Sequence, residues 1–222
     1  MVTLFHYIHC PFCIRIRLAL GILNISYKSV VLDYDDEETP IQMTGNKMLP
    51  IVKLDDQYLN ESLDIIKTLD KNDILQNELT ESKENKVEIT SLLEKLGKSI
   101  HNLCMPYWVW TPEFTSLSRK YFREKKEIKR GHFADLMSKK STFLCELNES
   151  LSKLEDHLMP FYNSKEITIM DIMIASHLWG MFVFPEFRFP DKVYNYLTEI
   201  KKQTNFNYHE DYYQHQYWDS GK

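Results

Sequence analysis

Two cysteines near the start of the chain, Cys10 and Cys13, have the C-x-x-C spacing within the stretch YIHCPFCIRIRLALG. Such a pair can be a disulfide, half of a metal site, or a nucleophile with a resolving thiol. Because Pro11 suits the first turn of a helix, Cys10 is expected at a helix N-terminus, where unpaired N–H groups and the helix dipole lower a thiol pKa. Cys13 is one turn further on the same face, so it can reach Cys10 while being more buried and less activated. The two sulfurs are therefore predicted to differ.

Two arginines, Arg15 and Arg17, follow on the same predicted helix. At 100° per residue Arg15 is expected to point away from Cys10, and Arg17 lies about 10 Å along the axis. The helix N-terminus is therefore expected to be the first cause of a lowered Cys10 pKa. We interpret His9 as a neighbour in the sequence and not as a group that tunes the thiol.

A zinc site is an alternative, since His101 and Cys104 could complete a four-ligand set with the C-x-x-C pair. The second half-site falls in another predicted domain, and Pro11 is better explained by helix initiation, so no metal is expected. Two packed core thiols are a further alternative. Cys104 and Cys145 lie alone within helical apolar patterns, which predicts that both are buried.

The segments around the motif predict a thioredoxin-like order of elements, βαβ-αββα. Residues 3–8, 27–32 and 49–54 have the composition of strands, with a helix from Pro11 and a short helical segment within 35–43 between them. A turn at 55–57 leads to a further short strand and to a helix that opens at 60–62.

From residue 71 to 86 the chain is polar, and the periodic segments after it are helical. We therefore predict a domain at 1–75, a linker at 76–88 and an all-helical domain at 89–222. Thr168 and Asp171 predict a capping box that starts a buried helix. A leucine repeat predicts a helix packed on a core, at Leu144, Leu147, Leu151, Leu154 and Leu158. The aromatic end, from residue 207, is expected to pack on the helical domain or to expose a partner surface.

The charge balance narrows the classes of partner. The 222 residues include 27 Lys and Arg against 32 Asp and Glu, a net charge of −5, so nucleic acid is not expected as a partner. The N-terminus has no basic region followed by an unbroken apolar run, and no long apolar segment follows, so we expect neither a signal peptide nor a membrane span. A C-x-x-C pair in such a chain indicates a cytoplasmic protein.

The CPFC motif resembles the Cys-Pro-Tyr/Phe-Cys of glutaredoxins, and the added helical domain resembles that of glutathione transferases. This combination is similar to the bacterial glutaredoxin 2 family over nearly the whole chain. Other matching stretches are ETP with Gly45, LPI, ESLDI, RKYF at 119–122, KKE at 125–127 and FADL at 133–136. The resemblance implies an α/β thioredoxin-like N-terminal domain plus an all-α glutathione-transferase-like C-terminal domain.

The same resemblance implies a glutathione site. Pro50 would be the cis-proline of the fold, and Leu49 before it would offer backbone hydrogen bonds to the cysteinyl part of glutathione. Glu61 and Ser62, at the start of a helix, would hold the γ-glutamyl end. The implied glutathione-binding residues are Pro11, Phe12, Leu49, Pro50, Glu61 and Ser62.

The activity implied is glutathione-dependent reduction of protein disulfides and glutathione mixed disulfides, with Cys10 as the nucleophile and Cys13 as the resolving thiol. Glutathione would be a cosubstrate, no cofactor would be tightly bound, disulfide-containing or glutathionylated proteins would be the partners, and the chain would be a monomer. Two alternatives stay open. One is a glutathione transferase that conjugates electrophiles, in which Cys13 would be idle, and the other is a non-catalytic glutathione-binding module that senses redox state.

Overall fold

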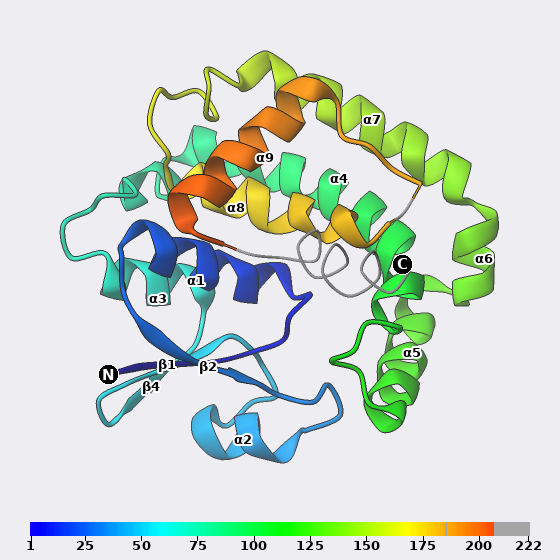
Figure 1. Cartoon of the computed structure of the whole chain (residues 1–222), viewed down its shortest axis with the longest axis horizontal. Coiled ribbons are helices and arrows are strands. Elements are labelled where there is room, and N and C mark those ends of the chain that lie inside the picture. The colour runs from blue at the N-terminus through cyan, green and yellow to red at the C-terminus, as the bar shows by residue number, and fades with distance from the viewer. Residues whose placement is uncertain (185, 207–222) are drawn as a thin grey trace, which may run out of the picture.

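A computed structural model describes residues 1–184 and 186–206, which form a small mixed sheet with its helices, followed by a helical part. In Figure 1 the sheet lies at the lower left, and the C-terminal helices lie above it and to its right. The aromatic segment at 207–222 lies outside the described residues, so its role stays a prediction.

Four strands make up the sheet: β1 at Val2–His6, β2 at Tyr27–Val31, β3 at Ile51–Leu54 and β4 at Gln57–Leu59. Their order is β2-β1-β3-β4, with β1 parallel to β2 and antiparallel to β3, and with β3 antiparallel to β4. Along β1, buried residues alternate with half-buried ones, which is the period of two expected when one face packs on a core.

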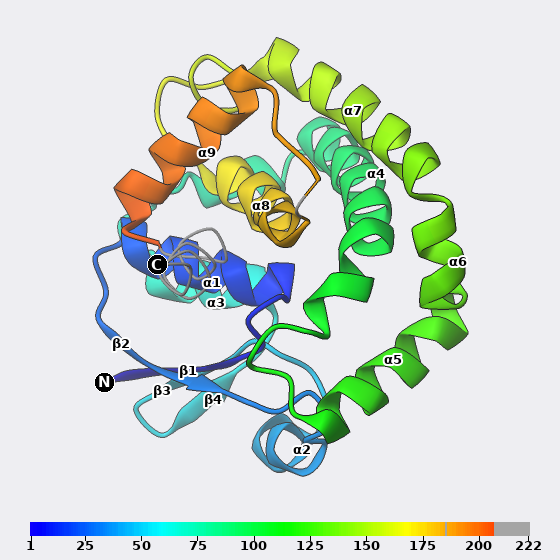
Figure 2. The same ribbon diagram turned by 45° about the vertical axis from the view of Figure 1, so that its right-hand side comes forward.

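Three helices accompany the sheet: α1 at Pro11–Ile22, α2 at Glu38–Thr44 and α3 at Ser62–Leu69. α1 packs beside α3 on one side of the sheet, and α2 lies on the other side (Figure 2). The order of elements is the predicted βαβ-αββα, with helix and strand ends shifted by up to three residues. Pro11 is the first residue of α1, where its missing N–H costs no hydrogen bond.

The helical part follows a short 3-10 helix, η1, at Asn77–Thr80. Its helices are α4 at Lys83–Trp108, α5 at Ser116–Arg130, α6 at Phe133–Ser138, α7 at Lys140–His157, α8 at Ile169–Leu178, a 3-10 helix η2 at Trp179–Val183, and α9 at Asp191–Thr204. α4 and α7 pack along each other. The leucine repeat lies on α7 and on Leu158 directly after it, and Leu147, Leu151 and Leu154 are fully buried, so the predicted packing on a core is confirmed.

α8 joins the two parts of the molecule. All of its residues are buried, it packs on α1 and α4, and one apolar cluster runs from the sheet through α1 into the helical part. The predicted capping box is present, with the Asp171 carboxylate accepting a hydrogen bond of 2.8 Å from the Thr168 N–H. The segment predicted as a linker, 76–88, contains η1 and the first turns of α4. The domain boundaries stay a prediction.

The two lone cysteines differ. Cys104 on α4 is buried, as predicted, and its sulfur lies 3.3 Å from that of Met181. Cys145 on α7 is exposed, so its predicted burial is wrong. One residue along a helix is a rotation of 100°, which carries Cys145 away from the side of α7 on which Leu144 and Leu147 pack against the core. Among the described helices, none is long and apolar enough to cross a membrane.

Candidate active site

Cys10 lies at the entrance to α1, as the sequence predicts. It is the N-cap residue, with an extended backbone, and its carbonyl accepts the first helical hydrogen bond from the Ile14 N–H at 2.9 Å. Its side chain is half-buried, whereas Cys13 on the first turn is fully buried. The two thiols therefore occupy the unequal environments that were predicted.

The pKa of Cys10 lies below the ordinary value for a thiol. The largest cause is a hydrogen bond from the Cys13 thiol, which lowers the pKa. Burial raises the pKa. The N–H groups of Cys13 and Phe12, and then the charge of Arg15, lower it further. The helix N–H groups come ahead of the arginine, as predicted, but the Cys13 thiol, which the sequence reasoning did not weigh as a cause, comes before both, because it is in direct contact with the sulfur. Burial raises the pKa of Cys13. The hydrogen bond that Cys13 shares with Cys10 and the negative charge of the Cys10 thiolate raise it further. The negative charge therefore belongs to Cys10 and the proton to Cys13.

Arg15 does not have its predicted orientation. Its guanidinium carbon lies 4.6 Å from the centre of the Phe12 ring, and the side chain is 95% buried, with 5% of its surface exposed. Helical side chains lean toward the N-terminus of their helix, so a long arginine covers the turn before its own Cα. Its charge therefore reaches Cys10, although its Cα lies on another face of α1.

The loop before β3 forms a wall of the thiol site. The Leu49–Pro50 bond is cis, as the resemblance implies, and the Cys10 sulfur lies 4.0 Å from the Leu49 carbonyl oxygen. Cys13, Leu49 and Ile51 form one small apolar cluster, and Cys10 packs against it. The role of the Leu49 backbone toward a ligand stays a prediction.

The start of α3 lies next to Arg15. Ser62 is buried, and its hydroxyl oxygen accepts a hydrogen bond of 3.4 Å from Arg15. Glu61 before it is exposed and has φ 68° and ψ 106°, a rare backbone conformation that costs about 1–3 kcal/mol in a residue other than glycine. Their binding role stays a prediction, but the structure connects Ser62 to the helix that carries both thiols.

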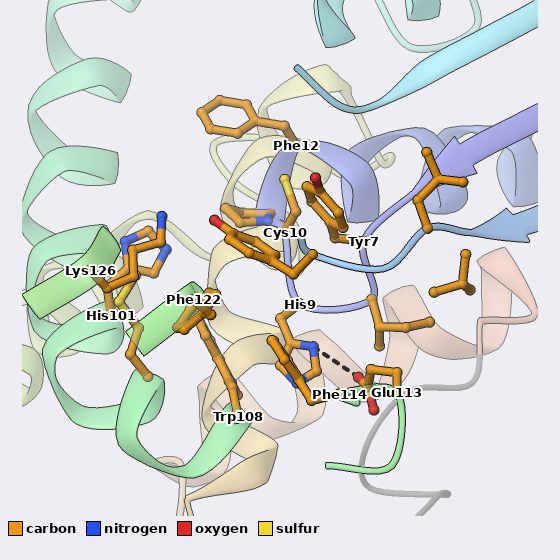
Figure 3. Close-up of a pocket in the computed structure, with 16 residues that line it drawn as sticks. Tyr7, His9, Cys10, Phe12, His101, Trp108, Glu113, Phe114, Phe122 and Lys126 are labelled. Carbon is orange, nitrogen blue, oxygen red and sulfur yellow. Dashed lines mark ion pairs between the residues drawn. The ribbon is translucent and has the colours of Figure 1, made fainter. Parts of the chain in front are cut away.

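A cavity of about 250 Å³ opens beside Cys10, between the sheet-containing part and the helical part (Figure 3). Its walls come from the β1–α1 loop, the segment from the end of β2, and α4 and α5 with their connection. Most of the lining is aromatic or aliphatic: Tyr7, Ile8, His9, Cys10, Pro11, Phe12, Val31, Leu32, Tyr34, His101, Met105, Trp108, Glu113, Phe114, Phe122 and Lys126. Of the residues predicted to bind glutathione, Pro11 and Phe12 line it.

Sequence reasoning did not single out three polar residues of this cavity, Tyr7, Tyr34 and Lys126. Tyr7 lies close to Cys10 in Figure 3, its hydroxyl has no hydrogen-bond partner among the described residues, and burial raises its pKa. The Lys126 ammonium lies 5.4 Å from the centre of the Phe122 ring, and burial lowers its pKa. The three residues come from distant segments and match no spacing motif, so only the folded chain brings them together.

His9 connects the two parts of the molecule. Its Nδ1 lies 2.9 Å from the Glu113 carboxylate, the pair drawn as a dashed line in Figure 3, and its Nε2 lies 3.0 Å from the Thr111 hydroxyl. The rings of Trp108 and Phe114 pack edge-on against it, with centres 5.3 and 5.5 Å away. These contacts hold α4 and the segment after it against the β1–α1 loop.

The four candidate zinc ligands do not gather into one cluster in the part of the chain that the structure describes. His101 lines the cavity with Cys10, accepts a hydrogen bond of 3.2 Å from Arg130, and has a pKa lowered to about 3 by burial. Cys104 packs against Met181 in the core instead. Within residues 1–184 and 186–206, no group of three or more His, Cys, Asp or Glu could hold a metal ion.

Family models match both parts of the chain. Residues 4–75 match the N-terminal domain of glutathione S-transferases, and residues 88–212 match the C-terminal domain of glutaredoxin 2. Glutaredoxin 2 of Escherichia coli K12 is 32% identical over 211 residues, which cover 93% of this chain and 97% of that protein.

Solved structures agree with these matches. The crystal structure of glutaredoxin 2 from Salmonella typhimurium in complex with glutathione is 30% identical, with a TM-score of 0.83 over 94% of this chain and 96% of the other. A glutathione transferase of Phanerochaete chrysosporium is 15% identical, with a TM-score of 0.73 over 93% of this chain and 99% of the other, and shares the fold. The predicted fold, a thioredoxin-like part followed by a helical part like that of glutathione transferases, is thereby confirmed.

Proposed function

Because the chain belongs to the glutaredoxin 2 family, we propose that it is a glutathione-dependent thiol-disulfide oxidoreductase that reduces protein disulfides and glutathione mixed disulfides. One observation carries the proposal: a half-buried thiol of lowered pKa receives a hydrogen bond from a buried thiol of raised pKa one turn away. The first has the charge a nucleophile needs, and the second keeps its proton until the first has reacted.

In the proposed reaction, the Cys10 thiolate attacks the glutathione sulfur of a mixed disulfide. A bond forms between Cys10 and glutathione, the original S–S bond breaks, and the other thiol leaves with the electron pair. A second glutathione then attacks the glutathione sulfur, which releases glutathione disulfide and restores the Cys10 thiolate. With a protein disulfide, Cys10 first forms a disulfide with one substrate sulfur while the other substrate sulfur leaves as a thiolate. Cys13 then attacks the Cys10 sulfur, which breaks the bond to the substrate and releases its second thiol, and two glutathiones reduce the Cys10–Cys13 disulfide while forming glutathione disulfide.

The proposed glutathione site lies on three segments around Cys10, and its residues are Pro11, Phe12, Leu49, Pro50, Glu61 and Ser62. Pro11 and Phe12 line the cavity beside the thiolate, and Leu49 is in contact with the Cys10 sulfur. The N–H groups at the start of α3 have no partner within the helix, which suits the carboxylate of a γ-glutamyl group. The Salmonella relative that was crystallised with glutathione supports this assignment.

We propose glutathione as a cosubstrate, with no tightly bound cofactor, and disulfide-containing or glutathionylated proteins as partners of a monomeric chain. Regeneration of both thiols consumes glutathione, so the proposed reaction suits a reducing compartment such as the cytoplasm.

The rival function is glutathione transfer to an electrophile. The aromatic cavity beside Cys10 favours it, because an apolar electrophile could occupy that space next to a glutathione thiolate. A transferase would conjugate faster than it reduces disulfides and would not need Cys13. A non-catalytic glutathione-binding module would turn over neither substrate.

The test is a glutathione-coupled reductase assay on the wild type, Cys10→Ser and Cys13→Ser, with a mixed disulfide and a protein disulfide as substrates. Cys10→Ser should remove essentially all reduction, because an alcohol stays protonated at neutral pH. Cys13→Ser should keep substantial activity on the mixed disulfide and lose much more on the protein disulfide, since no neighbouring thiol releases the trapped intermediate. Reduction that survives Cys10→Ser would overturn the nucleophile assignment, and equal effects of Cys13→Ser on both substrates would overturn its resolving role.

A further inference from the structure

Arg15 is a buried cation that pairs with no carboxylate in the part of the chain that the structure describes, although its charge acts on the Cys10 thiolate. It is 95% buried, with 5% of its surface exposed, and its Nε has no hydrogen-bond partner. None of the ion pairs within residues 1–184 and 186–206 involves it. Burial lowers its pKa to about 10, so the guanidinium stays charged at neutral pH. A buried charge of this kind is costly unless an anion accompanies it.

The polar contact that Arg15 makes points to where such an anion would bind. Its Nη1 lies 3.4 Å from the Ser62 hydroxyl oxygen at the start of α3. An arginine has no acceptor, so the hydroxyl oxygen must accept this hydrogen bond and keeps its own proton for another partner. Arg15 therefore fixes Ser62 as a donor.

The surroundings of Ser62 favour a carboxylate as that partner. The first N–H groups of α3 also point out of the helix as unpaired donors. A hydroxyl donor, helix N–H groups and a buried positive charge together match an anion that accepts several hydrogen bonds. The guanidinium carbon also lies 4.6 Å from the centre of the Phe12 ring, and its hydrogen bond to Ser62 reaches the start of α3.

We propose that Arg15 is a positioning residue of the glutathione site, which holds Ser62 as a donor and supplies the charge that receives the α-carboxylate of the γ-glutamyl unit. This inference rests on the proposed function. It also connects substrate recognition to the nucleophile, because α1 carries both Arg15 and Cys10. The competing assignment, in which Arg15 serves only as a counter-ion of the Cys10 thiolate, predicts a different experimental result.

The experiment compares two mixed disulfides of 2-mercaptoethanol. One contains glutathione, and the other contains an analogue whose γ-glutamyl unit lacks the α-carboxylate but keeps the amino group. All proteins carry Cys13→Ser, so the Cys10 adduct accumulates and can be followed by intact-protein mass. In each reaction Cys10 forms a disulfide with the peptide sulfur, and 2-mercaptoethanol leaves as the thiolate. The quantity measured is the second-order rate constant for each disulfide, and their ratio is the selectivity for the carboxylate.

With Arg15 in place, the glutathione disulfide should react about ten-fold or more faster than the analogue. A ratio of this size corresponds to the free energy that one hydrogen bond to a charged group contributes. Arg15→Met should bring this ratio to within about three-fold, chiefly by slowing the glutathione disulfide. Arg15→Lys should restore part of the ratio, because it returns a charge without the planar fork of donors. Arg123→Met, the same substitution at an exposed position on α5, should leave the ratio unchanged.

Three outcomes would overturn the inference. One is a wild-type ratio near one, and another is an Arg15→Met protein in which both rate constants fall equally, as expected for a structural residue or a counter-ion of the thiolate. Because Arg15→Met can reduce stability, Ser62→Ala provides an independent test with Arg15 intact. The third outcome against the inference is a Ser62→Ala protein whose ratio of rate constants equals that of the parent protein. Failure of the proposed function looks different: the parent protein would then form no Cys10 adduct with either disulfide.

Discussion

The hydrogen bond from Cys13 to Cys10 gives a quantitative expectation for the reactivity of the Cys10 thiol. This bond is the largest cause of the lowered Cys10 pKa. A hydrogen bond to a charged group is worth about 1.5–3 kcal/mol, and a thiol is a weak donor, so its removal should cost about 1.4 kcal/mol, or about one pKa unit. Cys13→Ala removes the donor and should raise the Cys10 pKa by about that unit. Cys13→Ser keeps an O–H donor and should leave the pKa near the wild-type value.

The assay is the rate of Cys10 alkylation by iodoacetamide as a function of pH. The rate follows the thiolate fraction, so it falls ten-fold for each unit below the pKa and is level above it. Cys145 is exposed and would also react, so all proteins should carry Cys145→Ser, while Cys104 is buried. An unchanged pKa in Cys13→Ala would refute the hydrogen bond as the cause. Equal shifts in the alanine and serine variants would also refute it, because serine retains the donor.

Two further predictions concern stability. Gly21→Ala should lower the free energy of unfolding by about 1–3 kcal/mol, because a Cβ at Gly21 would lie 2.0 Å from the Thr204 carbonyl oxygen, where α1 meets the end of α9. A denaturant titration measures this change, and an unchanged midpoint would contradict the close approach. Burial lowers the pKa of His177 to about 4, so between that pH and its unfolded value of about 6.5 unfolding takes up a proton, and stability falls as the pH falls. His177→Gln should reduce the slope of unfolding free energy in this range by up to about 1.4 kcal/mol per pH unit, and an unchanged slope would show that His177 is already protonated.

The features that the sequence predicted well are set by neighbouring residues. Pro11 starts α1 because proline fits the first turn of a helix, and Thr168 and Asp171 start α8 because their side chains bond each other's backbone. The inequality of Cys10 and Cys13 follows in the same way from their places one turn apart. Each of these inferences needs only a few residues of the chain and the geometry of one helix.

The features that the sequence did not predict depend on long side chains or on packing between distant segments. A helical wheel gives the direction of Cα–Cβ bonds, and it failed for Arg15 because an arginine spans more than a turn of helix. Cys145 was assigned to the core although it lies one position off the leucine stripe of α7. The cavity could not be predicted at all, since its walls come from the β1–α1 loop, the end of β2, α4 and α5, which meet only in the folded chain.

The packing of the helical part also determines how substrates can approach Cys10. A thioredoxin-like domain alone would leave the start of α1 open on this side, but here α4 and α5 close it and leave about 250 Å³ beside the sulfur. A space of that size accommodates a small thiol and excludes a folded protein. Phe12, which lines this cavity, has 47% of its surface exposed. Under the proposed function we therefore expect a protein disulfide to approach Cys10 over the exposed face of Phe12, and the leaving thiol of a small mixed disulfide to occupy the cavity.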